Sequence, residues 1–159
     1  METIPYLTKE DVAVLDSLLL DYLQKAEAKT TLLLDKGGTI IAQQGETGSI
    51  DVSIIAALAA GSFAATKELA SRLGEKEFSA IYHQGKHLHI FVSAIDEHSI
   101  LTTIFGENTT VGLVRFYTVN LGAQLASLLD SLRKRSLTDT HFLPALELES
   151  KVPAGKIFV

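Results

Sequence analysis

Residues 30–44, TTLLLDKGGTIIAQQ, decide the fold. Thr30 to Asp35 and Thr39 to Gln44 are short runs of residues that favour strands, and Lys36-Gly37-Gly38 joins them. Glycine adopts positive φ angles at no steric cost, so a link of this length and composition predicts a β-hairpin. The rest of the fold is therefore arranged around a pair of antiparallel strands.

Amphipathic helices are predicted before this hairpin and near the end of the chain. The first runs from Thr8 to Ala26, with Thr8 and Asp11 placed to cap it. Its apolar positions are Val12, Leu15, Leu19, Tyr22, Leu23 and Ala26. The last is capped by residues 106–110 and ends near Arg135. Its predicted buried side holds Leu113, Phe116, Leu121, Leu125, Leu128 and Leu132.

A middle helix is predicted from Ser49 or Asp51 to about Leu73, with Gly74 as its stop signal. Its larger apolar residues form one stripe, which we expect to face the sheet: Ile55, Leu58, Ala65, Leu69 and Leu73. The other stripe is small and bare: Ala57, Ala60, Ala64, Lys67 and Ser71. Such a stripe lets another backbone approach closely, which favours a contact with a partner or a second copy. The alternative is an alanine-rich helix favoured by intrinsic propensity.

A second hairpin is predicted from Phe78 to Val92, where two alternating runs flank Gln84-Gly85-Lys86. If His83 pairs with His87, then His83, His87 and His89 share one face of the sheet. Three imidazoles can hold Zn²⁺, but no carboxylate at a fixed spacing completes a site, and a solvated or hydrogen-bonded cluster is the simpler interpretation.

A fifth strand is predicted from Ser99 to Phe105, which gives the order helix, two strands, helix, three strands, helix. An α+β fold, with one five-stranded, mainly antiparallel sheet covered by helices on both faces, satisfies every apolar stripe. Residues 8–135 form the predicted domain. Residues 136–159, with Pro144 and Pro153 in an apolar and acidic stretch, form a predicted tail or docking segment.

Composition narrows the functional class. The 159 residues include 47% hydrophobic and 21% charged residues, as expected for one globular domain, and no cysteine, which favours a cytosolic protein. The N-terminus lacks the pattern of a secretion signal, and the longest uncharged stretch, Val52 to Thr66, is shorter than a membrane span. A net charge of −5 argues against a general affinity for nucleic acid.

Sequence motifs for catalysis were not found. The P-loop, dinucleotide-binding, nucleophile-elbow and HExxH patterns are missing, so we expect no catalytic residues, cofactor or metal. Asp96 and Glu97 are adjacent acids in a turn, where a solvated loop is the simpler interpretation than acid-base chemistry. Arg72, Arg115 and Arg133 are candidates for an arginine that assists phosphoryl transfer, but the role of an ordinary surface residue is the simpler interpretation.

Several motifs together resemble the Roadblock family of dynein light chains, and most closely its bacterial MglB branch. They are Leu34-Asp35-Lys36-x-Gly38, Ala60-Gly61 with Ala64-Ala65, Leu73-Gly74-Glu75, His83-x-Gly85 and Gly112-Leu113-Val114-Arg115. The likeness covers about Thr8 to Arg135. It implies a Roadblock-type α/β/α sandwich and a homodimer whose sheets join edge to edge and whose middle helices lie side by side.

The resemblance also implies a function. Proteins of the MglB branch bind a small Ras-like GTPase of the MglA type and stimulate GTP hydrolysis by remodelling its switch regions, in bacterial cell polarity and gliding motility. The implied contact residues are Ala57, Ala60, Ala64, Lys67 and Glu68. The implied location is the cytoplasm, concentrated at a cell pole. Other Roadblock proteins are non-catalytic adaptors, and this alternative remains open.

Overall fold

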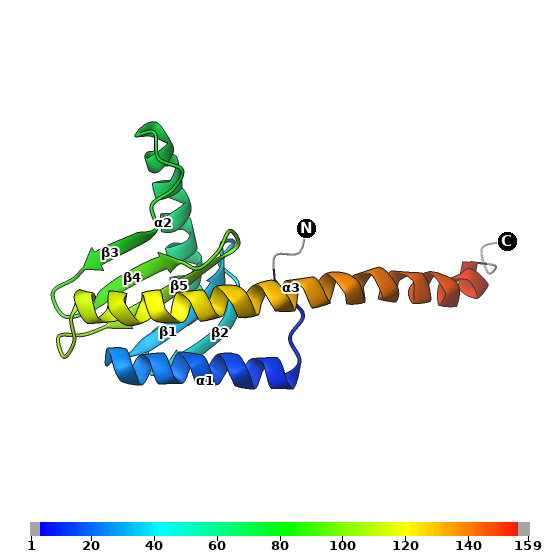
Figure 1. The fold of residues 1–159 in the computed structure, drawn as a ribbon, viewed down its shortest axis with the longest axis horizontal. Coiled ribbons are helices and arrows are strands. Elements are labelled where there is room, and N and C mark those ends of the chain that lie inside the picture. The colour runs from blue at the N-terminus through cyan, green and yellow to red at the C-terminus, as the bar shows by residue number, and fades with distance from the viewer. Residues whose placement is uncertain (1–3, 156–159) are drawn as a thin grey trace.

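The computed structural model describes the backbone of residues 4–155 and the side chains of residues 4–138. Its five strands form one open antiparallel sheet in the order β2-β1-β5-β4-β3 (Figure 1). The elements are α1 Lys9–Ala26, β1 Thr30–Asp35, β2 Ile40–Gly45, α2 Val52–Arg72, β3 Ala80–Gln84, β4 His89–Ala94, β5 Ser99–Phe105 and α3 Val111–Gly155. The predicted element order and fold class are confirmed.

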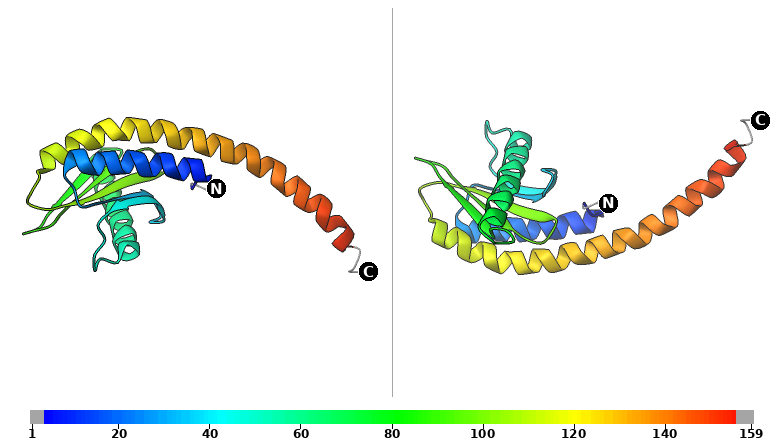
Figure 2. Two further views of the ribbon diagram at one scale, coloured as in Figure 1. Left: turned by 90° about the horizontal axis from the view of Figure 1, so that it is seen from below. Right: turned by 90° about the horizontal axis from the view of Figure 1, so that it is seen from above.

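Helices cover both faces of the sheet. α1 and α3 lie side by side on one face, and α2 lies on the other face (Figure 2). The larger core is formed between α1, α3 and the sheet, and its fully buried side chains include Leu15, Leu19, Leu33, Phe105 and Leu125. In α1 the predicted apolar positions from Leu15 to Ala26 are buried, whereas Val12 is 40% exposed.

The local signals for helix ends act as the sequence predicted. Thr8 and Asp11 form a reciprocal capping box at the start of α1, and Asp51 Oδ1 accepts hydrogen bonds from the backbone N–H groups of Ser53 and Ile54 at the start of α2. Gly74, with φ +83°, follows the C-cap Leu73 of α2. These caps fix where α1 and α2 begin.

The first hairpin has its predicted strands to within a residue. A register shift between Leu33 and Leu34 interrupts the pairing of β1 with β2. Gly38 adopts φ +96° in the turn, and a Cβ atom there would lie 3.2 Å from the Cα atom of Ala57. The turn therefore needs glycine both for its conformation and for the close approach of α2.

The third helix differs from its prediction in length and in rotation. It runs to Gly155 rather than ending near Arg135, because the basic run at residues 133–135 continues the helix instead of closing it. Its buried positions are Val114, Thr118, Leu121, Leu125, Leu129 and Leu132, and Phe116 is 59% exposed. Two hydrogen bonds join the N-terminal segment to α3: Arg135 Nη2 donates to the Tyr6 carbonyl, and Ser136 Oγ accepts from the Tyr6 N–H. The division of the chain after Arg135 stays a prediction.

Candidate functional site: the outer surface of α2

The inner side of α2 is built mainly from alanines. Ala56, Ala59, Ala60, Phe63 and Ala70 are its buried residues. The first four pack against Leu32, Leu34, Val92 and Ile100 of the sheet. Because the sheet already presents bulky side chains, alanines on the helix let the two layers come close.

Most of the larger apolar stripe of α2 lies outside, which contradicts its predicted orientation, and only Ile55 of that stripe packs partly against the core. Leu58 is 65% exposed, Leu69 55% and Leu73 68%. The helix also rises away from the sheet toward its C-terminal end, so its last turns have no sheet beneath them (Figure 1). Most of the larger stripe is therefore available to a partner, and the smaller stripe is also exposed except at Ala60.

Four of the five predicted contact residues are exposed. Ala57, Ala64, Lys67 and Glu68 are solvent-accessible, and the Arg72 side chain pairs with Glu68 at 3.1 Å one turn along the helix. Ala60 is only 4% exposed and faces the sheet, so its methyl group is not part of the outer surface.

Two adjacent strips run along the exposed side of α2, because residues recur at three- and four-residue steps on a helix. The first, here called the leucine strip, consists of Leu58, Ser62, Ala65, Leu69 and Leu73. The second, here called the alanine strip, consists of Ala57, Gly61, Ala64 and Glu68. A Cβ atom at Gly61 would meet nothing within 4 Å, so the fold itself does not require glycine there.

The leucine strip lies beside the edge strand β3. Ser62 Oγ is 3.5 Å from His83 Nε2 on that strand. β3 pairs only with β4 among the described strands, and its residues Tyr82, His83 and Gln84 are exposed. An uncovered strand edge beside exposed leucines is a surface suited to another protein chain.

The three histidines of the second hairpin do not converge. The observed pairs are Tyr82 with Phe91, His83 with Ile90 and Gln84 with His89. The predicted pairing of His83 with His87 is wrong, because the connection between the strands, residues 85–88, is longer than the three residues expected. His83 and His89 consequently lie on opposite faces of the sheet. No group of three metal-ligating side chains occurs among the described residues.

Each histidine has a local contact instead. His89 Nδ1 accepts a hydrogen bond from the Gly85 N–H at 3.2 Å, and its ring lies 5.2 Å from the Phe105 ring. His87 Nδ1 is 3.7 Å from a Glu107 carboxylate oxygen. The contacts of these side chains are those of a hairpin end rather than of a metal centre.

Arg115, Arg133 and the acidic turn at Asp96 also have structural contacts. Arg133 binds Asp96 and Ser99, and the Arg115 guanidinium lies 5.5 Å from the centre of the Phe91 ring. Burial raises the pKa of Asp96, but hydrogen bonds from Ser99 and Arg133 outweigh it and hold the pKa below its usual value. A carboxylate held ionised in this way is suited to an ion pair rather than to general acid catalysis.

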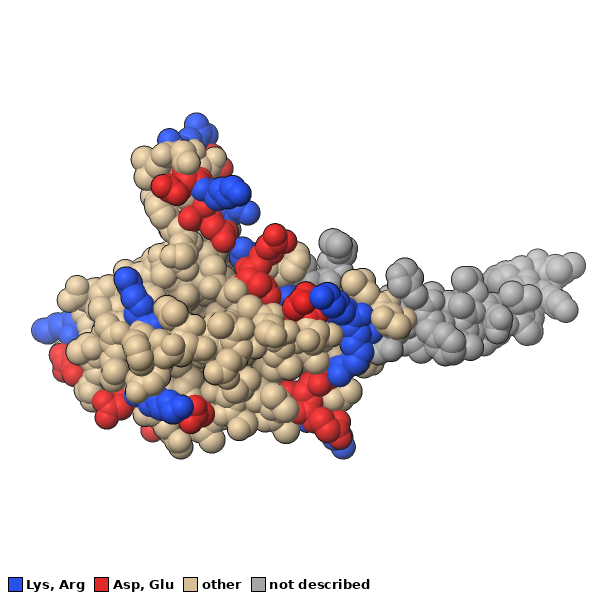
Figure 3. Space-filling model, viewed as in Figure 1, with Lys and Arg blue, Asp and Glu red and all other residues tan. Residues whose placement is uncertain are grey.

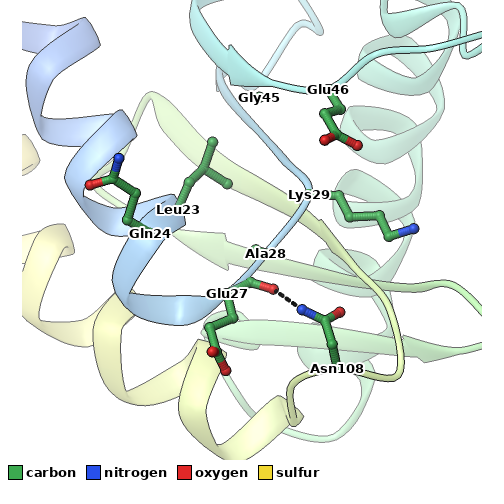
Figure 4. Close-up of a pocket in the computed structure, with 8 residues that line it drawn as sticks. All are labelled: Leu23, Gln24, Glu27, Ala28, Lys29, Gly45, Glu46 and Asn108. Carbon is green, nitrogen blue, oxygen red and sulfur yellow. Dashed lines mark hydrogen bonds between the residues drawn. The ribbon is translucent and has the colours of Figure 1, made fainter.

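An open hollow of about 490 Å³ lies at the C-terminal end of α1 (Figure 4). Asn108 Nδ2 donates to the Glu27 carbonyl at 3.0 Å, and the carboxylate of Glu27 points away from the charged ends of Lys29 and Glu46. A ligand in this hollow would meet no converging set of charged groups.

The length and composition of α2 also fit a membrane span. It is the one helix in the described part of the chain that is long and apolar enough, with 21 residues. Ala56, Ala59 and Ala60, however, pack on the sheet, which is the behaviour of a helix in a small α/β domain of the soluble type.

Comparison with known proteins identifies the same architecture. The family profile of the Roadblock/LC7 domain matches residues 14–105. The solved structure of MglB from Myxococcus xanthus is 30% identical, covers 80% of this chain and 96% of its own, and superimposes with a TM-score of 0.74. The gliding protein MglB from Thermus thermophilus is 27% identical, with coverage of 82% and 99% and a TM-score of 0.77. A structure described as MglB with a tetrameric arrangement is 26% identical, with coverage of 83% and 99% and a TM-score of 0.78.

Proposed function

Because the chain belongs to the Roadblock/LC7 family, we propose that it is a homodimeric regulator that binds a small Ras-like GTPase of the MglA type and stimulates GTP hydrolysis. Domains of this family are generally regulatory or adaptor domains, and the chain is similar to MglB over about four fifths of its length. The protein then works in the cytoplasm, concentrated at a cell pole, in bacterial cell polarity and gliding motility.

The observation that carries the proposal is the exposed pair of strips on α2 next to the β3 edge. Two copies that pair along β3 bring their α2 helices together, and the leucine strips cover one another. This arrangement removes Leu58, Leu69 and Leu73, each more than half exposed in one chain, from water. The homodimer is thus the assembly that the apolar surface favours.

The alanine strip remains outward in such a dimer and supplies the GTPase contact. Ala57, Gly61 and Ala64 allow a close approach of the partner's backbone, while Glu68 in the strip and Lys67 beside it provide charges. The regulator contributes no catalytic side chain in this mechanism. It binds the hydrolysis-competent arrangement of the switch regions more tightly than other arrangements, and so increases its population.

Phosphate release from the GTP-loaded GTPase tests this proposal. We expect an excess of the protein to accelerate release, and Ala64→Arg to abolish the acceleration because the large cation blocks the alanine strip. Gln124→Arg is the matched control, since Gln124 is exposed on α3 on the opposite face of the sheet.

Three outcomes separate the alternatives. Acceleration that survives Ala64→Arg shows that the GTPase contacts another surface. A GTP-dependent complex on a sizing column without acceleration shows an adaptor rather than an activator. Absence of both acceleration and complex contradicts a GTPase partner altogether.

A further inference from the structure

A second surface lies on the opposite face of the sheet from α2. A groove of about 460 Å³ runs between α3 and the outer strands β3 and β4. Its lining includes Ala80 and Ser93 from the sheet, Phe91, which is 2% exposed, and Val119 on α3. α1 and α3 lie side by side over the rest of this face, so the groove is the part that they leave open (Figure 2).

The α3 wall of the groove is apolar and shallow. Val119 is 68% exposed at its rim, and the following wall positions are Gly122, Ala123 and Ala126. A Cβ atom at Gly122 would make only an ordinary contact, 3.7 Å from Ile95 Cδ1, so the packing of α3 does not demand glycine there. The small residues instead leave room for another segment to lie against the helix.

Arg115 gives the groove its charge. It is the single charged residue among the groove-lining residues, and none of the ion pairs between described residues involves it. Its guanidinium lies over the Phe91 ring at 5.5 Å, above the floor of the groove. Figure 3 shows few charged side chains across the body of the domain on this side. An apolar segment that carries a carboxylate matches this combination.

We infer that the groove receives the C-terminal segment of a second copy of the chain. Residues 142–149, FLPALELE, combine apolar side chains with Glu147 and Glu149. The apolar residues suit the α3 wall, and the carboxylates complement Arg115. The occupant is therefore an apolar, acidic segment that the chain itself provides.

The segment comes from another copy because α3 is continuous. From Ala126 the helix carries the chain away from the groove, and residues 142–149 lie about 24 Å or more farther along its axis (Figure 2). A continuous helix cannot turn back onto its own first turns. Pairing along β3 involves the other face of the sheet and the strand edge, so this contact does not rest on the proposed GTPase function.

Site-specific disulfide formation in the full-length protein tests the inference, since the chain has no native cysteine. Ala123→Cys places a thiol in the groove, and Ser150→Cys places one beside the acidic segment. We expect mixing of the two variants under mild oxidation to give a covalent dimer. Gln124→Cys is the matched control, because Gln124 is exposed on α3 beside Ala123 but lines a separate hollow between α3 and α1.

Reversing the charge of Arg115, and then of Glu147 and Glu149, tests whether these side chains form the contact. Arg115→Glu should reduce the cross-link at least fivefold, and adding Glu147→Lys and Glu149→Lys to the Ser150→Cys chain should restore it. Equal cross-linking at residues 123 and 124, or a yield that ignores Arg115→Glu, overturns the inference. A chain carrying both cysteines that forms only an internal disulfide shows that its own segment is the occupant and also overturns it. The yield of the disulfide cross-link does not depend on GTPase stimulation, so the cross-linking experiment can contradict the groove contact without contradicting the proposed function, and the reverse also holds.

Discussion

Arg133 on α3 reaches Asp96 in the turn between β4 and β5 and donates a second hydrogen bond to Ser99 Oγ at 2.8 Å. Ser99 Oγ in turn donates to Asp96 at 2.7 Å, and so does the His98 N–H at 2.8 Å. The turn and the helix are thereby joined by one charged network, with side-chain exposures of only 15% for Arg133 and 20% for Asp96.

We expect Arg133→Met to lower the free energy of unfolding by about 1–2 kcal/mol, because it leaves a partly buried carboxylate without its cation. Urea denaturation at pH 7 measures this change. Lys134→Met is the control: its pair with Asp130 is exposed, so its loss should cost less than about 0.5 kcal/mol. Equal losses in the two variants would contradict a structural role for the Arg133 network.

The same network predicts an acid dependence. The pKa of Asp96 is lowered in the folded state, despite burial that raises it, because Ser99 and Arg133 bind the ionised form. Its stabilising contribution is therefore complete above the unfolded pKa of about 3.9 and is lost as the pH falls through the lower folded value. The stability difference between the native protein and Asp96→Asn should shrink below about pH 4. A difference that is constant from pH 7 to pH 2 would contradict this assignment.

Two glycines should respond in opposite directions to alanine. Gly38→Ala meets both a positive φ and the Ala57 backbone, so it should destabilise the protein by about 1–2 kcal/mol. Gly61→Ala has open space and a helical backbone, and should stabilise it by about 0.5–1 kcal/mol. Thermal unfolding under identical conditions measures both. A stabilising Gly38→Ala would mean that α2 does not approach the first turn closely.

The leucine strip should control association and leave the fold intact. We expect Leu69→Asp to convert a dimer to a monomer in sedimentation velocity, because it puts a charge into the apolar contact. Leu20→Asp, at a residue 46% exposed on α1, is the control and should sediment as the parent protein does. A Leu69→Asp protein that remains dimeric, with an unchanged circular dichroism spectrum, would exclude the leucine strip from the interface.

A buried hydroxyl network ties α1 to the sheet and to α3. Tyr22 Oη lies 2.7 Å from Thr103 Oγ1 and 2.8 Å from Thr118 Oγ1. Thr118 donates its own proton to the Val114 carbonyl, so Tyr22 donates to Thr118 and accepts from Thr103. Tyr22→Phe should cost about 1–2 kcal/mol in chemical denaturation, whereas Tyr6→Phe, at a residue 77% exposed, should cost almost nothing. Similar costs for both would show that the hydroxyl network is not stabilising.

The parts of the fold governed by neighbouring residues could be predicted from the sequence. The first hairpin depends on Gly37-Gly38 between two β-prone runs, and the starts of α1 and α2 depend on Thr8 and Asp51. These signals act over a few residues, so no tertiary information was needed. The element order followed from them.

The predictions that are wrong concern features set by contacts between residues far apart in the sequence. The register of β3 with β4 places Tyr82 opposite Phe91, and alternation within each run cannot reveal the length of the connection between them. The predicted burial of Leu58, Leu69 and Leu73 is wrong because the size of a side chain does not by itself decide which side of a helix faces the core. The alanines at 56, 59 and 60, with Phe63, recur at helical spacing, and that pattern was the available signal for a small inner side.

Because α2 extends beyond the sheet, its last turns can open locally more easily than its first turns. Between Ser62 and Arg72 only Phe63 and Ala70 are buried, so few tertiary contacts oppose local opening of these last turns. Their amide hydrogens should exchange with solvent sooner than those of the first turns, which rest on Leu32 and Val92. A partner bound to these turns also suppresses their local opening. Slower amide exchange would therefore reveal the bound partner even where no spectroscopic probe touches the interface.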